Sequence, residues 1–481
     1  MRQKSLKLNM VLNAIKGLMS IIFPLITFPY VSKVLGAKNL GRYNFSNSII
    51  SYLVLLAGLG ISTYAIREGA RIRAEKKEFE RFTSEMLSIN IWSTAGSYLI
   101  FIILLICVPK FRDYRMLLVI FSLQIVFKTI GIEWIYSIYE DYAYITIRSI
   151  AFQIISLVLL FIFVKDKDDT CIYALITVIS TVGSNLLNFI HGRKYCKISI
   201  VKDPNWKKHI KPILILFAMS ATVVVYVSSD ITILGFLCDD FTVGIYSVST
   251  KVYTIVKTVL SSVLIVSVPR LSALLGEDKK NAFWETSNDI YRIMITVVVP
   301  AIVGIIILRK EIVLVLSTNE FITATSSLAL LCVALFFCMG AWFWGQCILI
   351  PTKKEDIVFR VTVVCALVNI ILNFIMIPLW KENAAAITTI IAEGISFLWC
   401  GIEGKKIVNT VGIWKHYIKV IIGCLPIIAI GLIVHKFELP FLTNICIIIP
   451  SSVILYFASE VLMRNESVID IGRSIKRKIQ K

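Results

Sequence analysis

The sequence predicts an all-α, polytopic membrane protein with about fourteen transmembrane helices. Of its 481 residues, 57% are hydrophobic and only 17% are charged, a balance that soluble globular domains do not have. The apolar residues come in runs of about 20, the length a helix needs to cross the hydrocarbon core of a bilayer. Lys and Arg gather in alternate loops, as they do in proteins that cross a membrane many times.

The expected spans follow one another with short loops. The first six cover residues 9–31, 44–65, 86–108, 116–138, 145–164 and 171–190. The next six cover residues 212–237, 243–268, 290–308, 325–350, 358–378 and 384–402. Two more spans, 417–435 and 441–462, end the series. The first run contains Pro24 and Pro29 and lacks a small-residue cleavage site, so it is expected to stay as a helix rather than be removed as a signal peptide.

Basic residues give the expected orientation. Roughly 32 Lys and Arg residues fall on one side of fourteen spans, about 12 on the other and about 6 within spans, and the richer side stays in the cytoplasm. Both termini are therefore expected to be cytoplasmic. The net charge of +19 reflects this topology, and nucleic acid is excluded as a partner because no basic domain exists to hold it.

An internal repeat divides the chain. Three residues after the first span match three after the seventh at one offset of 203 positions: Gly41, Tyr43 and Ser46 match Gly244, Tyr246 and Ser249. Six spans per copy is an even number, so both copies insert in the same direction. We therefore expect two six-helix lobes related by a parallel pseudo-twofold axis, residues 1–205 and 206–410, followed by two extra helices and a basic tail at 411–481.

Five cationic side chains lie within apolar runs, where a charge costs at least about 2.5 kcal/mol unless it faces a hydrated cavity or a partner. They are Lys16, Lys128, Lys251, Lys257 and Arg292. We expect them to line a cavity between the lobes that accepts an anionic substrate. Polar residues on the same stretches would line that cavity: Asn13, Asn47, Ser51, Thr254, Asn369 and Asn373. For each of these polar residues, a hydrogen bond to a neighbouring helix is the alternative. For Lys16, the alternative is that its side chain extends to the membrane surface.

Three carboxylates also lie in the spans: Asp230, Glu393 and Glu133. Each is either an ion-coupling group that carries a proton or sodium ion, or a fixed partner for a buried lysine. No other cofactor is expected. The eleven cysteines have no metal-ligand spacing and the four histidines are dispersed, so neither a metal site nor a catalytic site is expected.

Four stretches resemble bacterial polysaccharide flippases (Wzx-type, which carry O-antigen or other repeat units) of the multidrug/oligosaccharidyl-lipid/polysaccharide exporter superfamily. They are FPYVSKVLG from Phe28, GRYNFSNSIISYLVLLAGLGISTYAIRE from Gly41, IEWIYSIYEDYAYITIRSI from Ile132 and NIILNFIMIPLWKENAAAITTIIAE from Asn369. The chain departs from many relatives at Ser137 and Ile138, and at Glu382 and Asn383, so sugar specificity cannot be transferred.

The resemblance implies a flippase in the bacterial cytoplasmic membrane. Its substrate would be an oligosaccharide repeat unit on undecaprenyl diphosphate, moved to the outer leaflet by alternating access, with a polysaccharide polymerase and glycosyltransferases as further partners. Buried cations suit a diphosphate. A drug or metabolite cation antiporter of the same superfamily is the first alternative, although it would need an acidic cavity. A membrane polysaccharide polymerase or ligase is the second, although the outer loops are too short for it.

Overall fold

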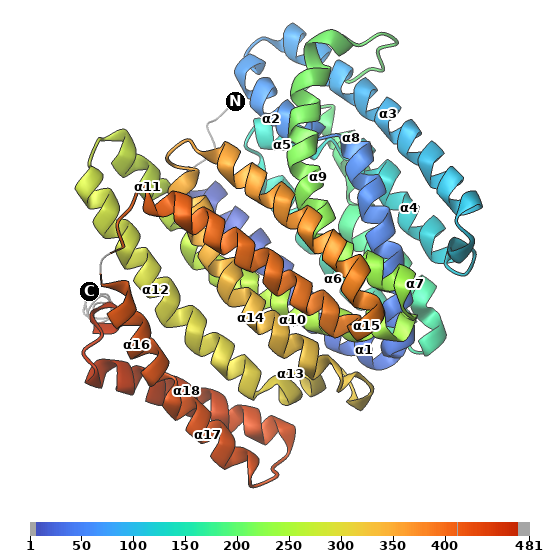
Figure 1. Ribbon diagram of the computed structural model, residues 1–481. Helices are drawn as coiled ribbons and strands as arrows, with labels where there is room; N and C mark the ends of the chain where they lie inside the picture. The colour runs from blue at the N-terminus through green and yellow to red at the C-terminus, as the bar shows by residue number, and fades with distance from the viewer. Residues whose placement is uncertain (1–5, 411, 470–481) are drawn as a thin grey trace. The chain divides into compact units, whose positions relative to one another are not determined.

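The computed structural model describes residues 6–410 and 412–469, except for the side chains of residues 6–11, 13, 14 and 263. Within that part of the chain every regular element is a helix, and no strand occurs. Eleven of the described helical segments are long and apolar enough to cross a membrane. The prediction of an all-α, multi-span protein is therefore confirmed (Figure 1).

Helix packing divides the chain into two compact units, Met1–Gly244 and Ile245–Lys481. Unit 1 contains α1 to α9: Leu6–Gly58, Ile61–Ile72, Lys76–Cys107, Arg115–Ile130, Glu133–Ile138, Tyr142–Phe163, Thr170–Val178, Asn185–Gly192 and Trp206–Leu237. In this unit α1 is central, since it packs against α3, α4, α6 and α9. The lobe boundaries at residues 205 and 410 stay a prediction, because compact packing and internal repetition are different criteria.

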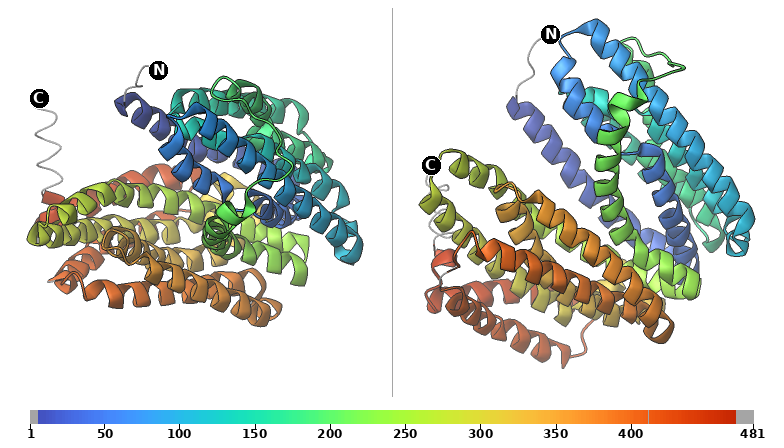
Figure 2. Two further views of the ribbon diagram at one scale, coloured as in Figure 1. Left: turned by 90° about the horizontal axis from the view of Figure 1, so that it is seen from above. Right: turned by 45° about the horizontal axis from the view of Figure 1, so that its top comes forward.

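Unit 2 begins within α10, whose first residues belong to unit 1. Its helices α10 to α18 are Asp240–Ile265, Ser267–Gly276, Lys280–Ile307, Arg309–Leu316, Ala324–Trp342, Glu355–Lys405, Ile413–Gly423, Leu425–His435 and Phe441–Leu462. Both views in Figure 2 show the yellow to red helices of this unit running side by side. The last helices form an edge of the unit, where α16 and α17 pack on α12 and α18 packs on α13 and α17.

Backbone breaks reconcile the long helices with the predicted spans. Gly36, at φ 70° and ψ 176°, interrupts α1, and Lys381, at φ 48° and ψ −127°, interrupts α15. Each of these helices therefore covers two of the predicted spans. Glycine suits the first break because a positive φ meets no Cβ clash there. The helix α4 has only 16 residues, so the count of fourteen stays a prediction.

The fourth predicted span is not one helix. It breaks at Ile132, whose φ of 34° is left-handed, so α4 ends at Ile130 and α5 begins at Glu133. Similarly, positive φ angles at Leu59 and Gly60 separate the end of the second predicted span as a short amphipathic helix, α2. Residue periodicity does not detect such breaks, because the apolar pattern continues across them.

The repeated glycines pack against each other's turns. A Cβ on Gly41 would lie 1.7 Å from the carbonyl oxygen of Asp240, and one on Gly244 would lie 1.9 Å from that of Ala37. Asp240 is the equivalent of Ala37 at the offset of 203. Such a reciprocal contact is what a twofold relationship produces, so it supports the predicted repeat.

Two helices contain π-helical turns, Ile179–Gly183 between α7 and α8, and Phe343–Leu349 after α14. These turns shift the side chains that follow onto a new face of the helix. Such turns are frequent at functional sites.

Candidate functional site

Three side chains of unit 1 meet at the break between α4 and α5. Glu133 is the first residue of α5, and its Oε1 accepts a hydrogen bond from Lys16 Nζ at 3.0 Å. The Nη2 atom of Arg148, on α6, lies 3.7 Å from the same oxygen. The break at Ile132 starts a new helix at Glu133, and the two cations come from the neighbouring helices α1 and α6.

Arg148 is the most deeply buried member of this cluster, only 7% exposed. Its Nε and Nη1 atoms are buried and have no hydrogen-bond partner among the described residues. Its guanidinium group lies 5.8 Å from the centre of the Tyr144 ring. A guanidinium group presents donors in a planar fork that matches phosphate and carboxylate oxygens. Two donors on Arg148 are thus available to a second anion.

Lys128 adds a third positive charge. It lies near the end of α4, is exposed, and is close enough to Glu133 to act on it electrostatically. Three cations therefore surround one carboxylate in this cluster, which keeps an excess of positive charge. We call Lys16, Lys128, Glu133 and Arg148 the cationic cluster.

The other predicted residues of unit 1 lie on α1 and α9, which contact each other, and α1 also contacts α4. Ser51 Oγ is 3.3 Å from Ser228 Oγ, and Asp230 acts electrostatically on Tyr52. Asn47 accepts a hydrogen bond from Gln124 Nε2 at 3.4 Å. These polar groups join helices within the unit. The side chain of Asn13 lies outside the described part of the chain.

A second ion pair lies in unit 2, between α10 and the second half of α15. Lys257 Nζ is 3.8 Å from Glu393 Oε1, and the hydroxyl of Tyr253 donates to the same oxygen at 3.4 Å. Glu393 is 6% exposed. On the same helix as Lys257, Thr254 is exposed and Lys251 is half-buried.

Arg292 has a different setting. Its Nη1 atom lies 3.6 Å from Glu466 Oε2, in the segment after α18. Because Lys251, Lys257 and Arg292 belong to unit 2, whereas Lys16 and Lys128 belong to unit 1, the convergence of all five on one cavity stays a prediction.

Asn369 and Asn373 form a buried network across the break in α15. Thr388 Oγ1 donates to Asn373 Oδ1 at 2.5 Å, and Asn373 Nδ2 donates to Asn369 Oδ1 at 3.1 Å. The two asparagines are 1% and 0% exposed. This geometry agrees with the expected alternative in which the two asparagines hydrogen-bond to a neighbouring helix. Neither amide lies on an accessible cavity wall.

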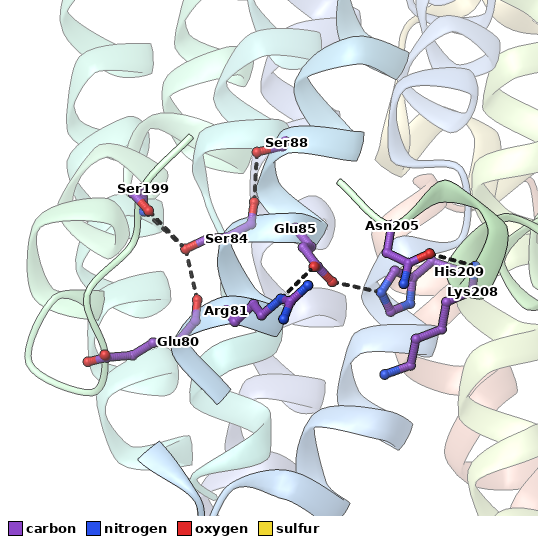
Figure 3. Close-up of polar contacts among 9 residues, drawn as sticks. All are labelled: Glu80, Arg81, Ser84, Glu85, Ser88, Ser199, Asn205, Lys208 and His209. Carbon is purple, nitrogen blue, oxygen red and sulfur yellow. Dashed lines mark hydrogen bonds and ion pairs between the residues drawn. The ribbon is translucent and has the colours of Figure 1, made fainter. Parts of the chain in front are cut away.

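Nothing in the sequence indicated the buried imidazole of His209, which lies among α2, α3 and α9 in unit 1. His209 is 0% exposed, with Nδ1 2.8 Å from the hydroxyl of Tyr64 and Nε2 2.9 Å from Glu85 Oε2. Arg81 Nε donates to the other oxygen of Glu85 at 3.1 Å (Figure 3). These residues line a cavity of about 260 Å³. All the polar atoms named here have partners, so the group ties α2, α3 and α9 together.

The segment before α9 is fixed to α3 by side chains. Ser84 Oγ accepts from the backbone N–H of Ser199 at 3.2 Å, and Ser88 Oγ accepts from that of Val201 at 2.8 Å. Figure 3 shows Ser84 and Ser88 one turn apart on α3, with Ser199 facing them.

Comparison with known proteins identifies the family of the chain. The family model described as polysaccharide biosynthesis protein matches residues 6–275, more than half of the chain. The chain belongs to this family. A second model, MatE, matches residues 215–375.

Two curated relatives match most of the length of this chain. The putative O-antigen transporter of Escherichia coli (strain K12) is 21% identical over 81% of this chain and 94% of its own. The capsular polysaccharide biosynthesis protein CapF of Staphylococcus aureus is 24% identical over 75% of this chain and 89% of its own.

Solved structures show the same fold. The lipid II flippase MurJ, in an inward closed conformation, aligns with a TM-score of 0.72 at 18% identity, over 95% of this chain and 99% of its own. A multidrug resistance MATE family transporter in an outward-facing conformation aligns with a TM-score of 0.56 at 16% identity, over 84% and 97%. The predicted family and fold class are therefore confirmed.

Sequence reasoning missed Arg148 in this family member. The residue stands four positions into the predicted span 145–164, where a cation is easily taken for a residue at the membrane surface. Its signal was Tyr144, four residues earlier on the same helix, since an arginine beside an aromatic ring has a partner for a buried position.

Proposed function

We propose that the chain is a flippase that moves a lipid-linked oligosaccharide from the inner to the outer leaflet of a bacterial cytoplasmic membrane. Membership of the polysaccharide biosynthesis family and the relatives named for O-antigen transport support this function. The substrate would be carried on undecaprenyl diphosphate. Alternating access between inward-open and outward-open states would move it, and the polymerase and glycosyltransferases of the same polysaccharide would be its partners.

The single observation that carries the proposal is the cationic cluster. A diphosphate brings concentrated negative charge, and two buried donors of Arg148 without a partner suit its oxygens. In the absence of substrate, Glu133 neutralises part of the positive charge through Lys16 and Arg148. The diphosphate would compete with Glu133 for these cations, so binding and release would exchange one anion for another.

Coupling to a proton or sodium gradient is part of the proposal. Glu393, Asp230 and Glu133 are the candidate groups. Glu393 and Glu133 each lie within 4 Å of a lysine, which supports the fixed-partner role of each carboxylate. A cycle in which the substrate breaks one of these pairs would expose the carboxylate to protons at that step.

The second candidate is a cation antiporter of the same superfamily, because the MatE model matches residues 215–375. A cationic substrate would need an acidic site. The excess positive charge around Glu133 favours the anionic substrate instead.

The test is transport by purified protein in proteoliposomes, with a labelled lipid-linked oligosaccharide and with or without an imposed ion gradient. We expect Arg148→Ala, Lys128→Ala and Lys251→Ala to reduce the initial rate about tenfold or more, as the loss of a charge-assisted hydrogen bond does. The matched control is Arg193→Ala, which removes an exposed arginine stacked on Phe189 in the same unit. Full activity of Arg148→Ala at normal protein level would refute the assignment, and uptake of a cationic drug in place of the lipid would favour the antiporter.

A further inference from the structure

A cavity of about 630 Å³ lies in unit 2, where α12 passes into α13 and α17 is followed by α18. Its wall has two parts. Ile307, Ile428 and Leu432 belong to an apolar part. The polar part consists of Arg309, Lys310, Glu311, His435, Glu438 and Asn444. Its volume is in the range of small-molecule sites, roughly 300 to 1,000 Å³. None of these residues belongs to the cationic cluster.

Two buried acceptor atoms in the wall have no donor. Glu311 and Asn444 are 4% and 6% exposed, and Asn444 Nδ2 donates to Glu311 Oε1 at 3.1 Å. His435 Nε2 lies 3.0 Å from the same oxygen, without the angles of a hydrogen bond. The remaining oxygens, Glu311 Oε2 and Asn444 Oδ1, are buried without a hydrogen-bond partner among the described residues. Since buried acceptors are normally satisfied, a ligand that brings N–H or O–H donors fits here.

The exposed charged residues of the wall are two cations and one carboxylate, Arg309, Lys310 and Glu438, which leave one net positive charge there. Arg309 and Lys310 are both exposed and line the same cavity, and Arg309 also donates to the carbonyl of Ile306 at 3.0 Å. These two cations suit a phosphate. A metal ion is a poorer match, because the described residues contain no group of three His, Cys, Asp or Glu side chains that could hold one. The complementary ligand carries a phosphate together with hydrogen-bond donors.

The apolar part of the cavity adjoins the exposed side of α17 through Leu432. Leu432 and Ile433 are 63% and 55% exposed in a helix that belongs to a candidate membrane span. In the wall of the cavity α12 and α17 are in close contact, since a Cβ on Gly431 would lie 2.4 Å from Ile307 Cγ2. A ligand held by the polar part would thus leave its apolar part along the outside of the helices.

We propose that this cavity binds the head group of a membrane phospholipid that carries a primary amine beside its phosphate. The ammonium group would donate to Glu311 Oε2 and Asn444 Oδ1, the phosphate would lie at Arg309 and Lys310, and the acyl chains would follow α17. This inference goes beyond the proposed function and does not depend on it, because it needs neither transport nor the cationic cluster.

The experiment compares two lipids on the full-length protein in detergent, by native mass spectrometry over a titration. Phosphatidylethanolamine has N–H donors, whereas phosphatidylcholine has the same charges and no N–H donor. We expect phosphatidylethanolamine to bind about tenfold more tightly, as the gain of hydrogen bonds to a charged acceptor implies. Equal binding of the two lipids would overturn the proposal. If soluble phosphoethanolamine displaced bound phosphatidylethanolamine at the same concentration as free phosphatidylethanolamine does, the assignment to a lipid would be overturned.

Variants locate the site. Glu311→Gln and Asn444→Ala should each reduce the preference for phosphatidylethanolamine to about threefold or less, and Arg309→Ala with Lys310→Ala should weaken both lipids alike. The control is Glu277→Gln, which removes an exposed carboxylate that pairs with Lys279 and does not line the cavity. If the buried variants fail to fold, the exposed double variant still decides: unchanged binding by it would overturn the location.

Discussion

Lys16 and Glu133 form an ion pair of 3.0 Å although 117 residues separate them in the chain. The pair joins α1 to the first turn of α5, and Arg148 lies 3.7 Å from the same carboxylate oxygen. Glu133 is therefore held by two cations from two helices. Its charge sets how strongly an added anion is attracted to the cluster.

Replacement of Glu133 by Gln should tighten anion binding. The variant keeps the shape of the side chain and removes the negative charge that competes for Lys16 and Arg148. We expect inorganic diphosphate to bind about tenfold more tightly, with transport slowed because release becomes harder. Isothermal titration with diphosphate measures the affinity. Glu68→Gln is the control, since Glu68 pairs with Arg67 and Arg71 on the partly exposed helix α2. Weaker binding of diphosphate by Glu133→Gln would contradict the model in which Glu133 competes with the anion.

Loss of Glu393 should destabilise unit 2. Glu393→Gln removes the counter-charge 3.8 Å from Lys257, whose side chain is 33% exposed. Breaking a buried pair costs about 3 to 5 kcal/mol, and the partial exposure of Lys257 places the expected loss near about 2 kcal/mol. Thermal unfolding in detergent measures it.

The double variant Lys257→Met with Glu393→Leu should recover most of that stability, because no unpaired charge remains. Glu403→Gln is the matched control. This variant breaks the surface pair of Glu403 with Lys406, whose charged atoms are 2.7 Å apart. The expected loss of stability is about 0 to 1 kcal/mol. An equal loss in Glu403→Gln and Glu393→Gln would show that burial of the pair does not matter.

Substitution of the repeated glycines should prevent tight packing of α1 on the start of α10. In Gly41→Ala or Gly244→Ala the new methyl group would meet backbone oxygens at 1.7 and 1.9 Å, and backbone cannot move aside as a side chain can. We expect a loss of at least about 3 kcal/mol and reduced protein in the membrane. Gly17→Ala, with no atom within 4 Å of its Cβ, should retain normal levels; normal levels of all three variants would contradict the close contact.

Removal of the carboxylate beside His209 should loosen the contact of α3 with α9. Glu85→Ala leaves Nε2 of a fully buried imidazole, and Nε of Arg81, without their acceptor. An unsatisfied buried polar group costs about 1 to 3 kcal/mol. Hydrogen exchange of α9 amides should rise in this variant. Glu78→Ala removes an exposed carboxylate from the same cavity and should leave the exchange unchanged; the same increase in both variants would assign the effect to charge alone.

Part of the candidate site was accessible from sequence because charge in an apolar run is rare. Lys16, Lys128 and Glu133 were identified in that way, and the structure brings them together. Arg148 was not identified, because a cation near the edge of a predicted span is expected to lie at the membrane surface. For Asn369 and Asn373 the sequence predicts either a cavity wall or a helix contact, since an amide on a helical face has the same pattern in both roles.

The sequence by itself determined the membrane class, the helical fold and the repeat, because apolar length and the alternation of basic loops are local properties that the bilayer imposes on every span. Only the tertiary structure decided which charges meet. The break at Ile132, the pairing of Lys16 with Glu133 and the burial of Arg148 depend on backbone angles and on side chains from distant helices. No periodicity within one helix contains that information, since the energy of each pair is set by the distance between its two charges.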